Sequence, residues 1–212
     1  MKYLKTFELK KNGISFEEWV KNNPIKEDAK TLYCYDNHIT DLNGIEKYTQ
    51  LTTLEIFMNH ITDLTPIENM TNLTKILCSN NNIHTINIEK LTNLKVLGIS
   101  SNNLTNIDIT PSLEILNCGK NSLEYLNIPK KSNLKQLNCS DNDIKELDLI
   151  NAIQLEILTC SNNKLKIIDN AEKCLKRIYC DGNDLSYSDV KGYWNWYYEY
   201  HDDRAEAEKF NF

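Results

Sequence analysis

Residues 134–144 read LKQLNCSDNDI, and this phrase decides the fold because seven other stretches of the chain repeat it. Its form is L-x-x-L-x-(L/I/C)-x-x-N-x-(L/I). The eight copies align on their asparagines, which are Asn37, Asn59, Asn81, Asn102, Asn121, Asn142, Asn163 and Asn183. These asparagines are 22, 22, 21, 19, 21, 21 and 20 residues apart, so only the segments between phrases vary in length. A period of about 20 residues indicates a solenoid in which one short unit stacks on the next.

The phrase alternates apolar and other residues around its second leucine, as Leu137, Asn138 and Cys139 show. This alternation predicts a short β-strand with one apolar face, and eight such strands about 4.8 Å apart make a parallel sheet about 38 Å long. The asparagine follows each strand, where its amide can satisfy backbone groups of the turn. The segments that lead to the next strand are too short for regular helices, so we expect 3₁₀ turns or extended chain. Second short strands are predicted at 107–109 and 147–149.

The phrase resembles the leucine-rich repeat, L-x-x-L-x-L-x-x-N/C-x-L, over about residues 29–185. The first repeats, with ITDLNGIEKYTQL and ITDLTPIENMTNL, are similar to the 22-residue internalin type. Later repeats such as NCSDNDIKELDL resemble cysteine-containing repeats of 19–21 residues. The resemblance implies a leucine-rich-repeat solenoid of the α/β class, a curved right-handed superhelix of mostly short parallel β-strands. Its outer segments would be 3₁₀ or extended, and its caps helical.

Each repeat forms one turn of the solenoid, which we call a rung. Both open ends of a solenoid must be sealed, because the terminal rung otherwise exposes apolar surface and an unpaired strand edge. We therefore predict an N-terminal cap at 1–28, eight repeats at 29–185, and a C-terminal aromatic and acidic cap and tail at 186–212. Ser15 and Glu18 fit a capping box, which predicts a helix over 16–22 with Trp19 covering the first rung. Aromatic residues would cover the last rung, and they are Tyr193, Trp194, Trp196, Tyr197 and Tyr198.

Six of the seven cysteines occupy the third apolar position of the phrase and are predicted to point inward: Cys34, Cys78, Cys118, Cys139, Cys160 and Cys180. The last four lie on consecutive repeats, so a zinc site or disulfides are alternatives. Tetrahedral zinc needs four ligands around one point, whereas this ladder spreads them along about 14 Å. Packing as small core residues is therefore favoured. Cys174 lies outside the phrase and is interpreted as a loop or core thiol.

Composition indicates which partners and which cellular compartment the protein is suited to. A net charge of −6 and a pI near 5.3 argue against a long-range field that gathers nucleic acid or anionic membrane. The N-terminal MKYLKTFELKKNG lacks the apolar core of a secretory signal, and no apolar run is long enough to span a membrane. With seven cysteines, an odd number, these features predict reduced thiols in the cytoplasm. Delivery into a host cell is compatible with the same features.

No catalytic motif stands out. The chain has no G-x-S-x-G, no glycine-rich phosphate loop and no H-E-x-x-H, so we predict no enzyme, no cofactor and no metal. His38 and His60 follow the asparagines of adjacent repeats and are expected to be neighbours at the rim, as a solvated pair rather than a metal site. An unrecognised enzymatic site near Cys174 or His201 is the alternative.

The exposed strand positions form the concave face, where solenoids usually engage partners. Bulky side chains gather on its first three repeats, and exposed aromatic residues often anchor interfaces. The predicted partner-binding residues are Tyr33, Tyr35, Phe57, Met58, Leu77, Glu55 and Lys75. The alternative is that the N-terminal segment covers this cluster as part of the cap. Later repeats carry small polar residues, which leave space near the backbone but few anchors.

These observations predict a non-catalytic protein–protein interaction scaffold or adaptor that binds a protein on its concave face, with the partner's identity and the oligomeric state open. The alternative is binding of nucleic acid or an anionic ligand. The basic residues available for it are Lys75, Lys95, Lys120, Lys135, Lys176 and Arg177. Carboxylates alternate with them, namely Glu55, Glu114, Asp141, Glu156 and Asp181, so no basic stripe forms and nucleic acid is disfavoured.

Overall fold

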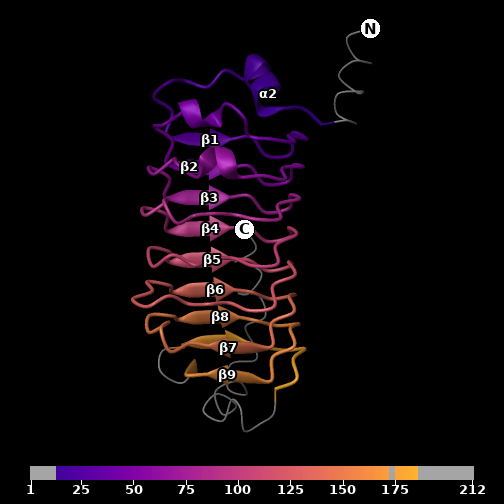
Figure 1. Cartoon of the computed structure of the whole chain (residues 1–212), viewed down its shortest axis with the longest axis vertical. Helices are drawn as coiled ribbons and strands as arrows, with labels where there is room; N and C mark the ends of the chain where they lie inside the picture. The colour runs from indigo at the N-terminus through magenta and orange to yellow at the C-terminus, as the bar shows by residue number, and fades with distance from the viewer. Residues whose placement is uncertain (1–12, 172–174, 186–212) are drawn as a thin grey trace.

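The computed structural model describes residues 13–171 and 175–185. The alternating phrases form strands of three residues each, which stack in chain order into one parallel sheet of eight strands (Figure 1). The strands are β1 (Thr31–Tyr33), β2 (Thr53–Glu55), β3 (Lys75–Leu77), β4 (Val96–Gly98), β5 (Ile115–Asn117), β6 (Gln136–Asn138), β8 (Ile157–Thr159) and β10 (Arg177–Tyr179). In every neighbouring pair the first residues of the two strands lie opposite each other. The predicted strands and columns are therefore confirmed.

The outer side of the solenoid carries shorter elements. Two 3₁₀ helices, η1 (Ile45–Lys47) and η2 (Thr65–Ile67), lie in the first two return segments, and β7 (Glu146–Asp148) pairs with β9 (Ile167–Asp169) in a second parallel sheet. The outer strand predicted at 147–149 is thus displaced by one residue. The one predicted at 107–109 is wrong, because that segment belongs to no strand although its isoleucines are buried. The alternation of apolar and polar residues predicted which side chains are buried. A strand also needs a neighbouring strand to which its backbone can hydrogen-bond.

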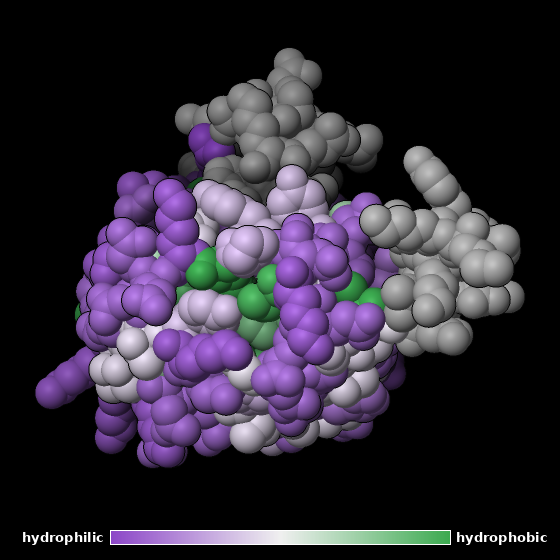
Figure 2. All heavy atoms as spheres, turned by 90° about the horizontal axis from the view of Figure 1, so that it is seen from above, coloured by the Kyte–Doolittle hydropathy of each residue, from purple (hydrophilic) through white to green (hydrophobic). Residues whose placement is uncertain are grey.

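The N-terminal helix α2 (Phe16–Asn22) closes the first rung, as predicted. Ser15 Oγ accepts a hydrogen bond from the Glu18 N–H at 3.1 Å, which satisfies one of the free donors at the helix start. The helix buries Phe16 and Trp19 against the interior. Figure 2 looks down on this end, where hydrophilic side chains surround a limited hydrophobic area. The aromatic residues predicted to close the other end lie outside the described residues.

The core is a continuous column of aliphatic side chains between the two sides of the solenoid. The middle residue of each main-sheet strand is buried, and these residues are Leu32, Leu54, Ile76, Leu97, Leu116, Leu137, Leu158 and Ile178. Burying one such side chain contributes about 1.5–3 kcal/mol. Because apolar contact is not directional, this burial favours stacking without fixing the register between rungs.

The ladder asparagines supply the directional contacts, and Asn142 shows how. Its Nδ2 donates to the carbonyl of Cys139 on its own rung at 3.0 Å and to that of Cys118 on the preceding rung at 3.1 Å. Its Oδ1 accepts from the Leu123 N–H, also on the preceding rung, at 2.9 Å. The same bonds recur at Asn59, Asn81, Asn102, Asn121, Asn163 and Asn183. Each amide thus ties its own rung to the one before it.

Asn37 is the first asparagine of the ladder and differs from the others. Its Nδ2 donates to the carbonyl of Tyr35 on its own rung, and its side chain is only partly buried. In the described part of the chain no strand of the main sheet precedes β1, so this amide has no earlier rung to hold.

We predict that Asn142→Ala lowers the free energy of unfolding by about 1–3 kcal/mol, because buried backbone groups lose their partners. Asn37→Ala is the matched control and should cost clearly less, since its amide bridges no earlier rung. Chemical denaturation measures both. A loss below about 0.5 kcal/mol for Asn142→Ala, the level of an ordinary surface substitution, would contradict the structural role of the ladder.

Candidate functional site

An exposed group of large side chains, the aromatic edge, lies on the first two rungs and consists of Tyr33, Tyr35, Phe57 and Met58. Tyr33 is 59% exposed, Tyr35 48% and Met58 52%, while Phe57 is half-buried. The rings of Tyr35 and Phe57 stack with centroids 4.7 Å apart and planes 3° apart. This distance equals the spacing of adjacent strands, about 4.7–4.9 Å, so the sheet itself holds the two rings face to face. The described part of the N-terminal cap leaves the edge open.

Leu77 does not belong to this exposed group, which corrects the expectation from sequence. Only 8% of Leu77 is exposed. A Cβ placed on Gly98 of the next rung would lie 2.9 Å from Leu77 Cδ2, so Leu77 occupies the space that a side chain at position 98 would need. Its burial depends on the glycine beside it.

Glu55 and Lys75, the two charged residues of the predicted site, bind each other across β2 and β3. Lys75 Nζ lies 3.1 Å from Glu55 Oε1, and both side chains are partly shielded from solvent. Such pairs contribute at most about 1 kcal/mol to stability. Next to the aromatic edge they form a neutral polar patch rather than two separate charges.

Other lysines of the sheet are paired in the same way. Lys135 and Lys95 both contact Glu114, at 2.7 and 3.0 Å, and Lys176 contacts Glu156 at 2.9 Å. Hydrogen bonds from Lys135 and then Lys95 lower the pKa of Glu114, which keeps that carboxylate charged. Four of the six basic residues considered for an anionic ligand therefore pair with carboxylates of adjacent rungs, although Lys95 and Lys135 share Glu114. This pairing weakens the nucleic-acid alternative.

The six ladder cysteines point into the core, as predicted, and Cys180 alone is only partly buried. Burial raises the pKa of Cys34 and Cys139 to about 12 and that of Cys180 to about 11. It also raises the pKa of the other three thiols well above the usual range. The thiolate is the reactive form, so these side chains are unsuited to nucleophilic chemistry.

The two rim histidines are neighbours, as the sequence predicts. His38 Nδ1 and His60 Nε2 lie 3.1 Å apart, so one ring donates a hydrogen bond to the other. No third potential metal ligand joins them within the described ranges. Cys174 and His201, named for an alternative enzymatic site, lie outside those ranges.

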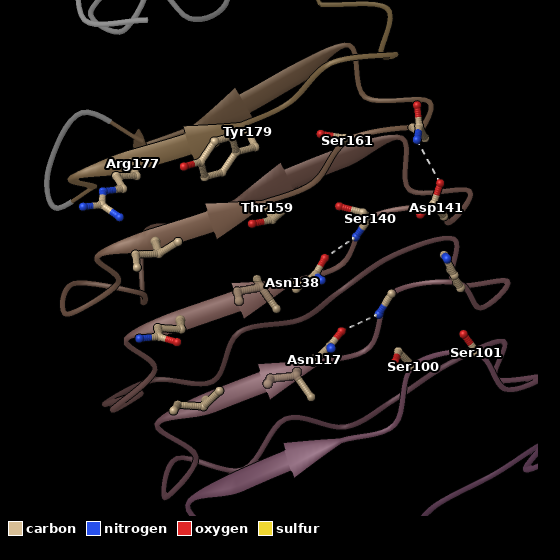
Figure 3. A pocket seen from close by; sticks show the side chains of 18 of the residues that line it. Ser100, Ser101, Asn117, Asn138, Ser140, Asp141, Thr159, Ser161, Arg177 and Tyr179 are labelled. Atoms are coloured by element: carbon tan, nitrogen blue, oxygen red, sulfur yellow. Dashed lines mark hydrogen bonds between the residues drawn. The ribbon is translucent and has the colours of Figure 1, made fainter. Parts of the chain in front are cut away.

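A second feature of the exposed face is a hollow of about 500 Å³ over β5, β6, β8 and β10, which we call the polar hollow (Figure 3). Its lining includes Asn117, Asn138, Thr159 and Tyr179 from the strands and Gly119, Ser140 and Ser161 from the turns that follow. Sequence reasoning noted the small residues here but did not recognise a site. The sequence feature that could have revealed the hollow is the series of small side chains at equivalent positions of consecutive repeats, because small side chains leave room above the backbone.

One polar atom of this hollow is unusual. Ser140 Oγ is buried, and no residue of the described ranges forms a hydrogen bond with it. On two earlier rungs of the same column the hydroxyls are bonded, since Ser100 Oγ donates to Ser79 Oγ of the preceding rung at 3.0 Å. The rung before Ser140 carries Gly119 at this position and so offers no hydroxyl.

Comparison with known proteins agrees with the geometry. The family described as "Leucine Rich repeats (2 copies)" matches residues 30–69. The functional domain of InlJ from Listeria monocytogenes, described as including a cysteine ladder, is 36% identical with a TM-score of 0.71, over 74% of this chain and 36% of that one. Internalin InlF from the same organism is 25% identical with a TM-score of 0.65, over 74% of this chain and 48% of that one.

The Leptospira interrogans protein LIC12759 is 22% identical with a TM-score of 0.68, over 78% of this chain and 52% of that one, and so shares the fold. The chain thus spans about a third to a half of these solved relatives. No curated protein matches it. In the ranges that the structure describes, no helix is both long and apolar enough to cross a membrane.

We predict that iodoacetamide labels the ladder cysteines of the folded protein very slowly near pH 8, because their raised pKa values leave almost no thiolate. Cys180, which is only partly buried and whose pKa of about 11 is the lowest among the six ladder cysteines, should be labelled first. Mass spectrometry measures the labelling of each cysteine. A Cys174→Ser variant is used so that the seventh thiol does not contribute. Rapid labelling of Cys118 or Cys139 without unfolding would contradict the burial of the ladder.

Proposed function

Because the chain is a leucine-rich-repeat protein, we propose that it is a non-catalytic scaffold that binds a partner protein on the concave, exposed face of its sheet. The observation that carries this proposal is the aromatic edge. Within it, Tyr33, Tyr35 and Met58 are each about half exposed, and Tyr35 stacks on Phe57 of the next rung. Exposed clusters of this kind are typical of interaction sites.

The geometry of the edge suits a protein surface. Tyrosine and phenylalanine lose little rotamer freedom on binding, and the stacked pair of Tyr35 and Phe57 is already ordered by the strand spacing. Met58 beside it is flexible and can adapt to the shape of a partner. The ion pair of Glu55 and Lys75 supplies a polar border. An apolar centre with a polar border is the usual anatomy of a protein–protein interface.

Two observations favour a scaffold over the alternatives. Four of the six basic residues near this face are paired with three carboxylates of adjacent rungs, which lowers the net positive charge that they offer to a nucleic acid. The ladder thiols are held protonated by burial and lack the thiolate that a nucleophile needs. We also propose that the protein works in a reducing compartment such as the cytoplasm, where free cysteines persist.

Affinity purification from the source cell, followed by mass spectrometry, tests the site. A double variant with Tyr35→Ala and Phe57→Ala should lose a protein that the unaltered chain retains, because it removes the stacked anchor. With that partner purified, either single substitution should weaken binding by at least about 2 kcal/mol. Folding stability should change far less, since both side chains lie on the exposed face of the sheet and not in the core.

Tyr125→Ala is the matched control, because Tyr125 is 61% exposed yet lies outside the aromatic edge. Neither it nor Ser140→Ala should alter affinity for this partner. A large stability loss for Phe57→Ala with affinity preserved would show instead that the edge belongs to the N-terminal cap. Retention of the partner by the double variant would place the site elsewhere.

A further inference from the structure

We propose that His38 and His60 form a metal site at the rim of the solenoid, which holds a late first-row divalent ion such as Zn²⁺ or Ni²⁺ between the first two rungs. The site contains no residue of the aromatic edge and does not depend on the function proposed for that edge. Three features support it: the separation of two ring nitrogens, the access of both rings to solvent, and the hydrogen bonds that hold the two backbones.

The first feature is the distance between the two facing nitrogens. His38 Nδ1 and His60 Nε2 lie 3.1 Å apart, and the ring planes are tilted by 45°. An ion about 2.0–2.1 Å from two imidazole nitrogens separates them by about 3.3–3.4 Å at a tetrahedral angle and by about 2.8–3.0 Å at a right angle. The observed separation falls between these values, so an ion can be bound after small rotations of the two rings.

The protons of the two rings are compatible with an ion. In the hydrogen-bonded pair one of the facing nitrogens carries a proton, whereas a metal-bound imidazole is neutral and has no proton on the binding nitrogen. Binding therefore requires a tautomer change in one ring, after which His38 carries its proton on Nε2 and His60 carries its proton on Nδ1. Two neutral rings lose no proton in this step, and nothing is oxidised or reduced.

The second feature is access. His38 is half-buried and His60 is exposed, so an ion from solvent can reach both rings. The described residues supply no third ligand, which leaves the remaining coordination positions of the ion to water. A site with two protein ligands and bound water is open, so we expect an exchangeable ion rather than a closed structural centre.

The third feature is the network that holds the two backbones. Asn59 Oδ1 accepts from the Ile39 N–H at 2.9 Å, and the His60 N–H donates to the Ile39 carbonyl at 2.8 Å. On the other side, the His38 carbonyl accepts from the Ile14 N–H of the N-terminal cap at 3.0 Å. These bonds place the two ligands before an ion binds, which lowers the entropic cost of forming the site.

The ligand type selects the class of ion. Imidazole nitrogens suit Zn²⁺, Ni²⁺ and Cu²⁺, whereas Mg²⁺ and Ca²⁺ prefer oxygen ligands. Zn²⁺ has no geometric preference from its d electrons and therefore tolerates an angle between ninety degrees and the tetrahedral value. An ion bound here would join the first rung, to which the cap is bonded, to the second rung. It would stabilise this end of the solenoid by mass action.

The test uses the full chain without an affinity tag, in the Cys174→Ser background so that this thiol does not bind the added ion. Calorimetry measures the binding of Zn²⁺ and Ni²⁺, with Mg²⁺ as the control ion. One Zn²⁺ should bind per chain, and Mg²⁺ should not bind. His38→Asn and His60→Asn each leave a single imidazole. Each should weaken Zn²⁺ binding at least about tenfold, because the second ligand of a chelate binds intramolecularly.

Asparagine is chosen because the next two rungs carry it at this position, as Asn82 and Asn103. It also tolerates the left-handed backbone of His38, whose φ is 57°. Both variants should therefore fold, which thermal melting without metal verifies, and His60→Asn remains informative if His38→Asn perturbs the fold. His84→Asn is the matched control, since His84 is an exposed histidine of the third rung outside the pair. It should leave Zn²⁺ affinity unchanged.

Two further measurements locate the ion. Saturating Zn²⁺ should raise the melting temperature of the unaltered chain and of His84→Asn but not that of His60→Asn. In nitrogen nuclear magnetic resonance spectra, the signals of His38 Nδ1 and His60 Nε2 should shift on addition of Zn²⁺, while those of His84 should not.

Equal Zn²⁺ affinity of the unaltered chain and of His60→Asn would overturn the proposal and leave the pair as a hydrogen bond between two solvated rings. Binding that is lost in His84→Asn, or spectral shifts confined to other nitrogens, would overturn it as well. Loss of the cellular partner in the Tyr35 and Phe57 variant bears only on the aromatic edge, so failures at the two sites are distinguishable.

Discussion

The rest of the structure depends on one contact, the amide of a ladder asparagine reaching back to the preceding rung. Apolar burial stabilises stacking but does not specify register, since it is not directional. Asn142 adds two hydrogen bonds to the rung of Cys118 and Leu123, and six other asparagines do the same on their rungs. Strands of three residues are thereby locked into one register, with their first residues aligned along the whole sheet.

This alignment produces the surfaces that a partner would meet. Because each strand position recurs at the same height on the next rung, like residues form columns. Two adjacent rings make the Tyr35–Phe57 stack, and adjacent small residues make the polar hollow. One face of a single sheet thus carries an apolar edge near its N-terminal end and a polar recess over its later rungs. The repeat sets the scaffold, and the variable positions set its chemistry.

Most of the fold could be predicted because its signals are local and repeated: the strands, the inward cysteines, the helix after Ser15 and the adjacency of His38 and His60. What was missed depends on neighbours in space. Leu77 is buried because position 98 on the next rung lacks a side chain. Ser140 Oγ is buried without a hydrogen-bond partner among the described residues. Residues 107–109 alternate like a strand but have no strand partner. The alternation of apolar and polar residues within one repeat cannot predict such contacts, because they depend on the residues of the neighbouring rungs.

Native-state hydrogen exchange tests the central claim most directly. The Leu123 N–H bonds to no main-chain carbonyl in the described structure but to Asn142 Oδ1, at 2.9 Å. The account predicts that this amide exchanges as slowly as those of β5 and β6, because it opens only when two rungs separate. In Asn142→Ala its protection should fall the most. Exchange as fast as in exposed turns in the unaltered protein would show that the asparagines do not hold the rungs together.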